Sequence, residues 1–138
     1  MVDLTGPKHT HTLERLRDDV ILWLASMRPD GRPHIVPVWF LWENGTVLIF
    51  SKPDNQKVRN LRQHPQVVLA LDDTQDGEDV VMLDGTAELV DDASVTAALP
   101  AYAAKYHTRI QRLFGTPEQM AALYSQAIRV TPTKVKVY

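Results

Sequence analysis

Apolar runs and alternating positions along the first third of the chain predict strands joined by tight turns. Residues 20–27 are apolar and fit a buried strand or a piece of helix, and the Pro29-Asp-Gly31 turn after them favours a strand that doubles back. Residues 34–43 and 46–51 flank Asn44-Gly45, a pair that tolerates positive φ and is the strongest short-range hairpin signal. Three consecutive antiparallel strands are therefore expected between residues 20 and 51.

Three further strands are expected in the rest of the chain. Residues 67–71 and 80–90 have the pattern of strands, and Gly85 marks a bulge or bend in the longer one. The alternating residues 128–137 predict a sixth strand, which Pro132 places at an edge or a bulge.

Short helices are expected between the strands. One starts near Thr12, and a second begins after Asp54-Asn55 and ends at His64-Pro65, because the residue before a proline avoids the α region. Residues 92–113 are alanine-rich and helical, and another helix follows Thr116-Pro117. Six strands, mostly in hairpins, with inserted helices predict a mainly β, α+β fold built on a small six-stranded antiparallel barrel.

Composition narrows the class of protein. The 138 residues, 15.6 kDa, predict a single domain over residues 1–138, with the polar residues 1–11 expected to be a flexible N-terminal segment. The absence of cysteine excludes disulfides, thiolate metal sites and a cysteine nucleophile. A net charge of −2 argues against nucleic-acid and polybasic membrane binding. No signal peptide and no apolar run of about 20 residues is present, so a cytoplasmic protein is expected.

Charge is unevenly distributed, and the basic stretch suggests an anion site. Four basic residues and one acid lie in 52–62, whereas 72–92 holds nine acids and no base. Such stretches are commonly solvated faces. Here, however, a strand end supplies a hydroxyl and an ammonium, and the following helix adds backbone N–H groups, an amide and a second ammonium, which suits a phosphate. The residues concerned are Ser51, Lys52, Gln56 and Lys57.

The strand 36–42 carries the second unusual feature. Pro37 has no N–H to donate, so it leaves a gap in the ladder where neighbouring backbone groups can bond a flat heteroaromatic ring. Trp39 and Phe40 add apolar surface beside it, although aromatic residues in strands are also ordinary core. The five histidines lack metal-ligand spacing and the serines lack a nucleophile elbow, so no metal site or catalytic residue is predicted. The residues alone thus indicate a planar ligand that bears a phosphate.

An ordered set of segments resembles the flavin-binding split barrels related to pyridoxamine 5′-phosphate oxidase. The likeness covers about residues 12–137, and the short chain with Pro37-Val-Trp-Phe40 looks like the actinobacterial branch that uses coenzyme F420, a deazaflavin. The segments are 30–40, 50–61, 64–69, 84–88 and 128–133. The resemblance implies a six-stranded split barrel and a homodimer with two cofactor sites at the subunit interface.

The resemblance also implies roles for individual residues. Val36, Pro37 and Val38 would contact the ring through their backbone, with Trp39 as a further contact. The phosphate would be held by Ser51, Lys52, Gln56 and Lys57, with Arg59 as a further contact. The C-terminal arginine pattern of the oxidase is not recognisable here, which argues against vitamin B6 oxidation. The longer anionic tail of F420 would extend past Lys57 towards Arg59 and Arg62.

These observations lead to one functional hypothesis with two alternatives. The first is an oxidoreductase that transfers hydride from reduced F420 to a small conjugated acceptor. The alternatives are an FMN-dependent reductase or oxidase and a non-catalytic binder of flavin, deazaflavin or haem, with His34 or His64 as the haem ligand. The apolar hairpin 39–49 is expected to be exposed on a single chain and therefore to support the homodimer.

Overall fold

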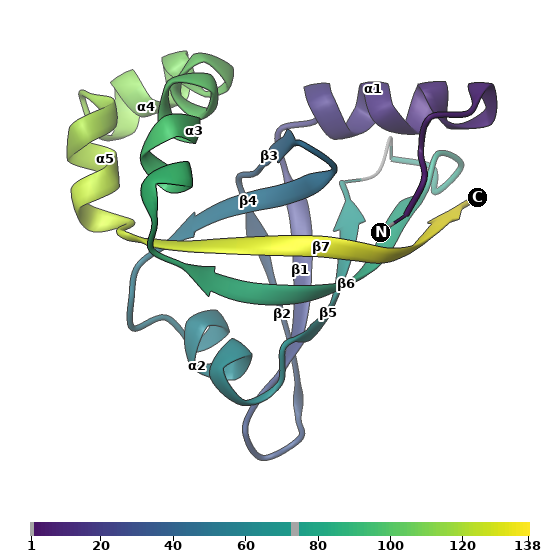
Figure 1. Cartoon of the computed structure of the whole chain (residues 1–138), viewed down its shortest axis with the longest axis horizontal. Helices are drawn as coiled ribbons and strands as arrows, with labels where there is room; N and C mark the ends of the chain where they lie inside the picture. Colours follow the sequence, from purple (N-terminus) through teal and green to yellow (C-terminus); the bar gives the residue numbers. More distant parts are fainter. Residues whose placement is uncertain (1, 73–74) are drawn as a thin grey trace.

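The computed structural model describes residues 2–72 and 75–138, so Met1 of the expected N-terminal segment and Asp73 of the acidic stretch lie outside it. Seven strands form one curled antiparallel sheet in the order β2-β1-β5-β6-β7-β4-β3 (Figure 1). The strands are β1 (Leu22–Met27), β2 (Pro33–Val38), β3 (Leu41–Glu43), β4 (Thr46–Ser51), β5 (Gln66–Leu71), β6 (Val81–Val90) and β7 (Gln126–Val137). The mainly β, antiparallel architecture predicted from the sequence is confirmed.

The predicted number of six strands is wrong, because the stretch expected as one strand over 34–43 breaks into two. β2 and β3 lie at opposite edges of the sheet, and the chain bends between them at Trp39 and Phe40. The backbone N–H of Phe40 donates to the hydroxyl of Tyr106 at 2.9 Å instead of to a neighbouring strand. Among the described residues β2 and β3 do not pair with each other, so the curled sheet is a barrel left open between these two edges.

Helices cover the ends of the sheet. Figure 1 shows α3, α4 and α5 grouped at one end, α1 at the other, and α2 below the sheet. Their bounds are η1 (Pro7–His9), α1 (Thr10–Asp18), α2 (Gln56–Gln63), α3 (Ala93–Lys105), α4 (His107–Leu113) and α5 (Pro117–Leu123). We call α3, α4 and α5 the helical cap. None of the helices within residues 2–72 and 75–138 is both long and apolar enough to cross a bilayer.

Several local expectations are met, and others shift. The first helix begins at Thr10, two residues before the predicted start, and Leu4 in the preceding segment is buried. The helix expected over 92–113 divides at Tyr106. The predicted irregularity at Gly85 is confirmed as a register shift between β6 and β7. A Cβ there would lie 2.6 Å from Cγ1 of Val130, so the close approach of the two strands requires glycine.

Two apolar clusters form the core, and β4 separates them. Val47 and Ile49 point into the barrel, whereas Leu48 and Phe50 pack against the helical cap. Val47, Leu48, Ile49 and Phe40 are completely buried within one chain. The expectation that hairpin 39–49 exposes apolar surface is therefore wrong, because the cap covers the face that a barrel alone would leave open.

Candidate functional site

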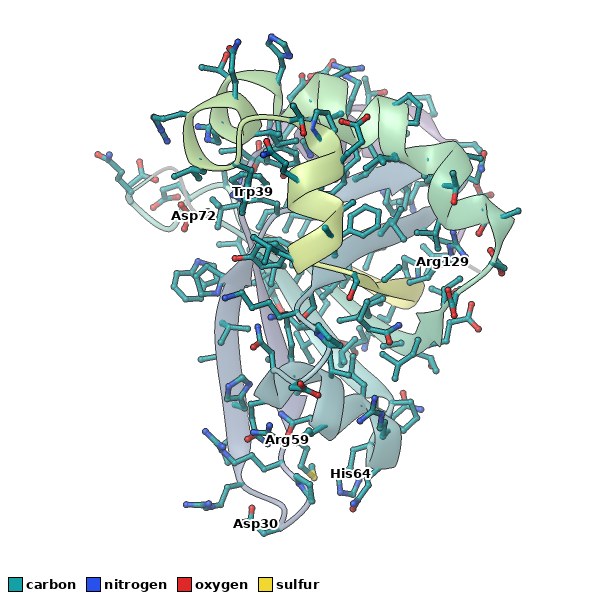
Figure 2. All side chains as sticks on the ribbon, turned by 90° about the vertical axis from the view of Figure 1, so that its left-hand side faces the viewer. Asp30, Trp39, Arg59, His64, Asp72 and Arg129 are labelled. Atoms are coloured by element: carbon teal, nitrogen blue, oxygen red, sulfur yellow. The ribbon has the colours of Figure 1, made fainter. Side chains whose placement is uncertain are left out.

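A cleft of about 350 Å³ opens between β2, β4, α2 and the helical cap. Its lining is aromatic and aliphatic, apart from the ammonium of Lys57 and the polar atoms of two tyrosines and a tryptophan. Figure 2 places Trp39 between the cap and the β1–β2 ribbon, and places Arg59 lower down, close to the same hairpin. The side chains in the lining are Ile21, Pro37, Val38, Trp39, Phe50, Lys57, Tyr102, Leu113, Phe114, Met120 and Tyr124.

Aromatic contacts fix one wall of the cleft. The ring of Trp39 stacks on Tyr106 at 4.6 Å and 4°, and it meets Phe114 edge-on at 6.2 Å. The Tyr106 hydroxyl accepts from the N–H of Phe40 and donates to the carbonyl of Val20 at 2.7 Å. These bonds tie the cap to the β2–β3 bend, so the wall is a packed and hydrogen-bonded surface rather than a loop.

The opposite wall is an edge strand. β2 pairs with β1 and has no strand partner on its other side in the sheet formed by the described residues. Pro37 is exposed and lines the cleft together with the buried Val38, whereas Val36 packs against the barrel core outside the lining. The gap in the ladder that Pro37 predicted therefore lies beside the cleft, where a ring edge can reach backbone groups.

Two cationic side chains, Arg28 and Lys57, lie near His34 where α2 meets the β1–β2 hairpin. The ammonium of Lys57 reaches the cleft, and burial lowers its pKa. Burial, together with the positive charges of Arg28 and Lys57, lowers the pKa of His34. The Nδ1 atom of His34 is enclosed and has no hydrogen-bond partner. No carboxylate within residues 2–72 and 75–138 forms an ion pair with Arg28 or Lys57, so a bound anion would offset both positive charges.

The other residues predicted to bind phosphate are engaged within the protein. Ser51 is fully buried, and its hydroxyl donates to the carbonyl of Lys52 at 2.9 Å. The guanidinium of Arg59 donates to Gln56 Oε1 and to the carbonyl of Asp54, both at 2.6 Å. Ser51, Gln56 and Arg59 lie outside the cleft lining. Lys52 is exposed, with its ammonium 5.7 Å from the ring centroid of the cleft residue Tyr124.

A buried polar chain holds α2, and with it Lys57, against the sheet. Asn60 is completely buried, and its amide donates to Ser26 Oγ of β1 at 2.9 Å. Its Oδ1 accepts from the Gln56 amide at 2.7 Å. Gln56 and Asn60 both lie on α2, so the Asn60–Ser26 bond is the one that joins the helix to β1, and rotation of α2 would break it in a buried place.

Sequence reasoning missed the half of the site that the helical cap supplies. The cap residues in the lining are Tyr102, Phe114, Met120 and Tyr124, which lie in or next to stretches that the sequence indicated only as helical. Arg28 had no signal at all in the sequence, because only the register of β1 on β2 brings it near His34.

The histidines considered as haem ligands do not line the cleft. Neither His34 nor His64 contributes to its lining, and Figure 2 places His64 far from Trp39, at the other end of the molecule. Across the part of the chain that the structure describes, no group of three His, Cys, Asp or Glu side chains is placed to hold a metal ion.

The fold is a small antiparallel split barrel with an aromatic-walled cleft that one lysine ammonium enters. Residues 9–138 match the pyridoxamine 5′-phosphate oxidase family, and the chain belongs to that family. No curated protein matches the sequence.

Several solved structures share this fold. An F420 reductase is 24% identical, with 89% of this chain and 94% of that chain covered and a TM-score of 0.70. The haem storage protein HutZ from Vibrio cholerae is 17% identical, with 99% and 95% covered and a TM-score of 0.68. General stress protein 26 from Bacillus anthracis is 19% identical, with 93% and 94% covered and a TM-score of 0.68. At these identities the likeness shows the fold alone.

Proposed function

We propose that this protein is a cytoplasmic oxidoreductase that binds coenzyme F420 in the cleft and passes hydride to a small conjugated acceptor. The observation that carries the proposal is an aromatic-walled cleft that the ammonium of Lys57 enters without forming an ion pair to any described residue. When bound, the deazaflavin supplies the hydride chemistry. The chain's own residues bind and orient the ring, exclude water from it and neutralise its anionic groups.

The ring and the anionic groups would be held by different elements. Pro37, Val38 and Trp39 offer an open backbone edge and an aromatic face to the ring. Lys57 offers a half-buried ammonium to the phosphate, and burial strengthens such a charge-assisted bond because less water competes for it. Gln56 and Arg59, which are bonded to each other, support this end of α2 from outside the cleft.

The choice of F420 over FMN rests on charge beyond the phosphate position. FMN ends at its phosphate, whereas F420 continues into a lactyl and glutamyl tail with further carboxylates. Arg28 adds a second cationic group near Lys57, since the charges of both act on His34. Arg59, expected from the sequence to meet this tail, is instead bonded to Gln56 and Asp54.

A titration of F420 and FMN against the same preparation tests the proposal. We expect a colourless protein as isolated, because a partly exposed ligand held by polar contacts at micromolar strength, about −8 kcal/mol, is lost on purification. F420 fluorescence should then change on binding, and FMN should bind more weakly. A yellow protein that retains stoichiometric FMN through gel filtration would assign the site to FMN. A Soret band after haem addition, with no F420 binding, would assign a haem binder.

We also propose a homodimer, now on a different surface from hairpin 39–49. Ile35 is 59% exposed and Met27 is 44% exposed. The register places Ile35 opposite Ala25 and Ala25 opposite Val68, so these side chains share the outward face of β1, β2 and β5. Apolar surface of this kind favours a partner, and a second copy would join the face at the edge of the cleft.

Light scattering tests the dimer directly. A dimer of the 15.6 kDa chain has a mass of about 31 kDa. Ile35→Asp should dissociate it, because the carboxylate would be buried without a partner. A wild-type mass near that of the single chain would contradict the dimer.

A further inference from the structure

Tyr102 of the helical cap has a buried ring that lines the cleft. Its side chain is 2% exposed and belongs to the lining. The ring meets Phe50 edge-on at 4.7 Å and lies 5.2 Å from Tyr106. Aromatic packing therefore holds the phenol in one orientation, whatever its hydroxyl does.

The hydroxyl of Tyr102 makes no hydrogen bond with any residue in the described part of the chain. Among the described residues, the fully enclosed side-chain atoms without a hydrogen-bond partner belong to His9, His34 and Asp84, and that of Asp84 is ion-paired with Lys136 at 3.3 Å. Tyr102 is not among them, so its hydroxyl oxygen is not fully enclosed. Because the side chain lines the cleft, the cleft is the space that this oxygen can reach. Buried phenols ordinarily find a partner, because an unmade hydrogen bond is costly.

Tyr106, one turn further along the chain, shows the opposite arrangement. Its hydroxyl accepts from the N–H of Phe40 at 2.9 Å and donates to the carbonyl of Val20 at 2.7 Å. The two tyrosines are similarly buried, but their hydroxyls differ in hydrogen bonding. Tyr106 is therefore a structural residue, whereas the partner of Tyr102 has to come from outside the chain.

We propose that the hydroxyl of Tyr102 donates a hydrogen bond to a carbonyl oxygen of the planar ligand in the cleft. The carbonyl belongs either to the ring of the redox cofactor or to the acceptor that takes the hydride. The identity of these two sources rests on the proposed function. In the second case, the acceptor is a flat conjugated carbonyl compound rather than a hydrocarbon.

The protonation state of Tyr102 suits a donor. Burial, together with the nearby phenols of Tyr106 and Tyr124, raises its pKa well above the usual value, so the group stays protonated at neutral pH. A neutral O–H aimed at a carbonyl oxygen stabilises negative charge that develops there and needs no proton transfer to do so.

Tyr102→Phe and Tyr106→Phe form a matched pair, since each removes one hydroxyl and keeps the ring. Without ligand, Tyr102→Phe should leave Tm unchanged or raise it by about 1–3 °C, because a hydroxyl without a protein partner is removed. Tyr106→Phe should lower Tm by about 5 °C or more, because the buried N–H of Phe40 loses its acceptor. An equal loss of Tm in both variants would overturn the inference.

Binding measurements identify the source of the carbonyl. In one arm, F420 and FMN are titrated against wild type and Tyr102→Phe. In the other, acetophenone and ethylbenzene, flat probes with and without a carbonyl, are titrated against cofactor-saturated protein, or against protein alone if no cofactor binds. Loss of the hydroxyl should lower either the affinity for the cofactor or the ratio of ketone affinity to hydrocarbon affinity, by about three- to tenfold.

Each outcome has a defined meaning. A loss in the first arm assigns the hydroxyl to the cofactor ring, and a loss in the second assigns it to the acceptor. Cofactor affinity and the ketone ratio both unchanged in Tyr102→Phe would overturn the inference while leaving the proposed function standing. If wild type binds neither F420 nor FMN, the proposed function fails, and the ketone ratio and Tm still test Tyr102.

Discussion

Replacing Lys57 by methionine separates binding from folding at this site. The ammonium reaches the cleft from α2, and no side chain in the described ranges forms an ion pair with it. Methionine keeps most of the aliphatic stem, which packs like the lysine methylenes, and removes only the charge. The variant therefore tests whether the charge itself holds an anion.

The expected magnitude follows from the environment of the ammonium. A charge-assisted hydrogen bond contributes about 1.5–3 kcal/mol, so the Kd for F420 and for FMN should rise by about 12- to 150-fold. Because Lys57 is only half-buried, the wild-type advantage should shrink as salt rises.

The same change should not destabilise the protein without ligand. Burial lowers the pKa of Lys57 from 10.5, so the folded state holds this proton less well than the unfolded chain does. At neutral pH both states carry the charge and the full penalty falls on the folded one, so methionine should leave Tm unchanged or raise it. This differs from the behaviour of an exposed helix lysine, whose removal is neutral.

Fluorescence titration of both cofactors at two salt concentrations is the assay, with thermal melting alongside. Arg62→Met is the matched control, because Arg62 is exposed on the same helix and does not line the cleft. If wild type binds F420 and the Kd of Lys57→Met stays within about twofold of it, the anion-site reasoning is refuted.

Other positions allow independent checks. The pKa of Lys105 is lowered from 10.5 to about 8, mainly by burial. Between pH 8 and 10 the unfolded chain thus keeps a proton that the folded chain has lost. Stability measured by urea unfolding should therefore rise with pH in wild type and lose that rise in Lys105→Met; a flat wild-type profile would contradict this. Gly85→Ala should cost about 1–3 kcal/mol, because its Cβ would meet Val130 Cγ1 at 2.6 Å; an unchanged urea midpoint would argue against the close packing. Arg15→Met should cost about 1–3 kcal/mol in thermal unfolding, because the buried guanidinium donates to the carbonyls of Asp72 and Asp79; full wild-type stability would show these bonds to be dispensable.

Local sequence signals predicted the hairpins well, because turn chemistry is local. Asn44 and Gly45 adopt φ of 50° and 74°, as the turn between β3 and β4 requires. The break of the expected strand 34–43 was not predictable in the same way. Its cause is the hydroxyl of Tyr106, which lies 66 residues away and captures the N–H of Phe40.

The residues of the candidate site also differ in whether a local sequence signal identifies them. Pro37 and Lys57 were identifiable, since a proline in a strand and a lysine at a helix start have a local chemical meaning. Tyr102 was not, because its ring is spaced like any core residue and a sequence does not state which hydroxyl lacks a partner. His34 appeared as an isolated histidine, and only the folding of the β1–β2 hairpin and α2 brings the charges of Arg28 and Lys57 near it.

The way this chain treats buried polar groups argues that the cleft is where function lies. Away from it, Arg15 is satisfied by Asp19 and two backbone carbonyls, and Asn60 by Ser26 and Gln56. Around the cleft, no described residue pairs with the Lys57 ammonium or accepts from the Tyr102 hydroxyl. Each of these omissions costs stability, and the two groups share one cleft, whereas the enclosed Nδ1 of His9 lies outside its lining. Groups left open at one end and on one wall of the same cleft are complementary to a single ligand that is anionic at one end and carries a carbonyl on a flat body.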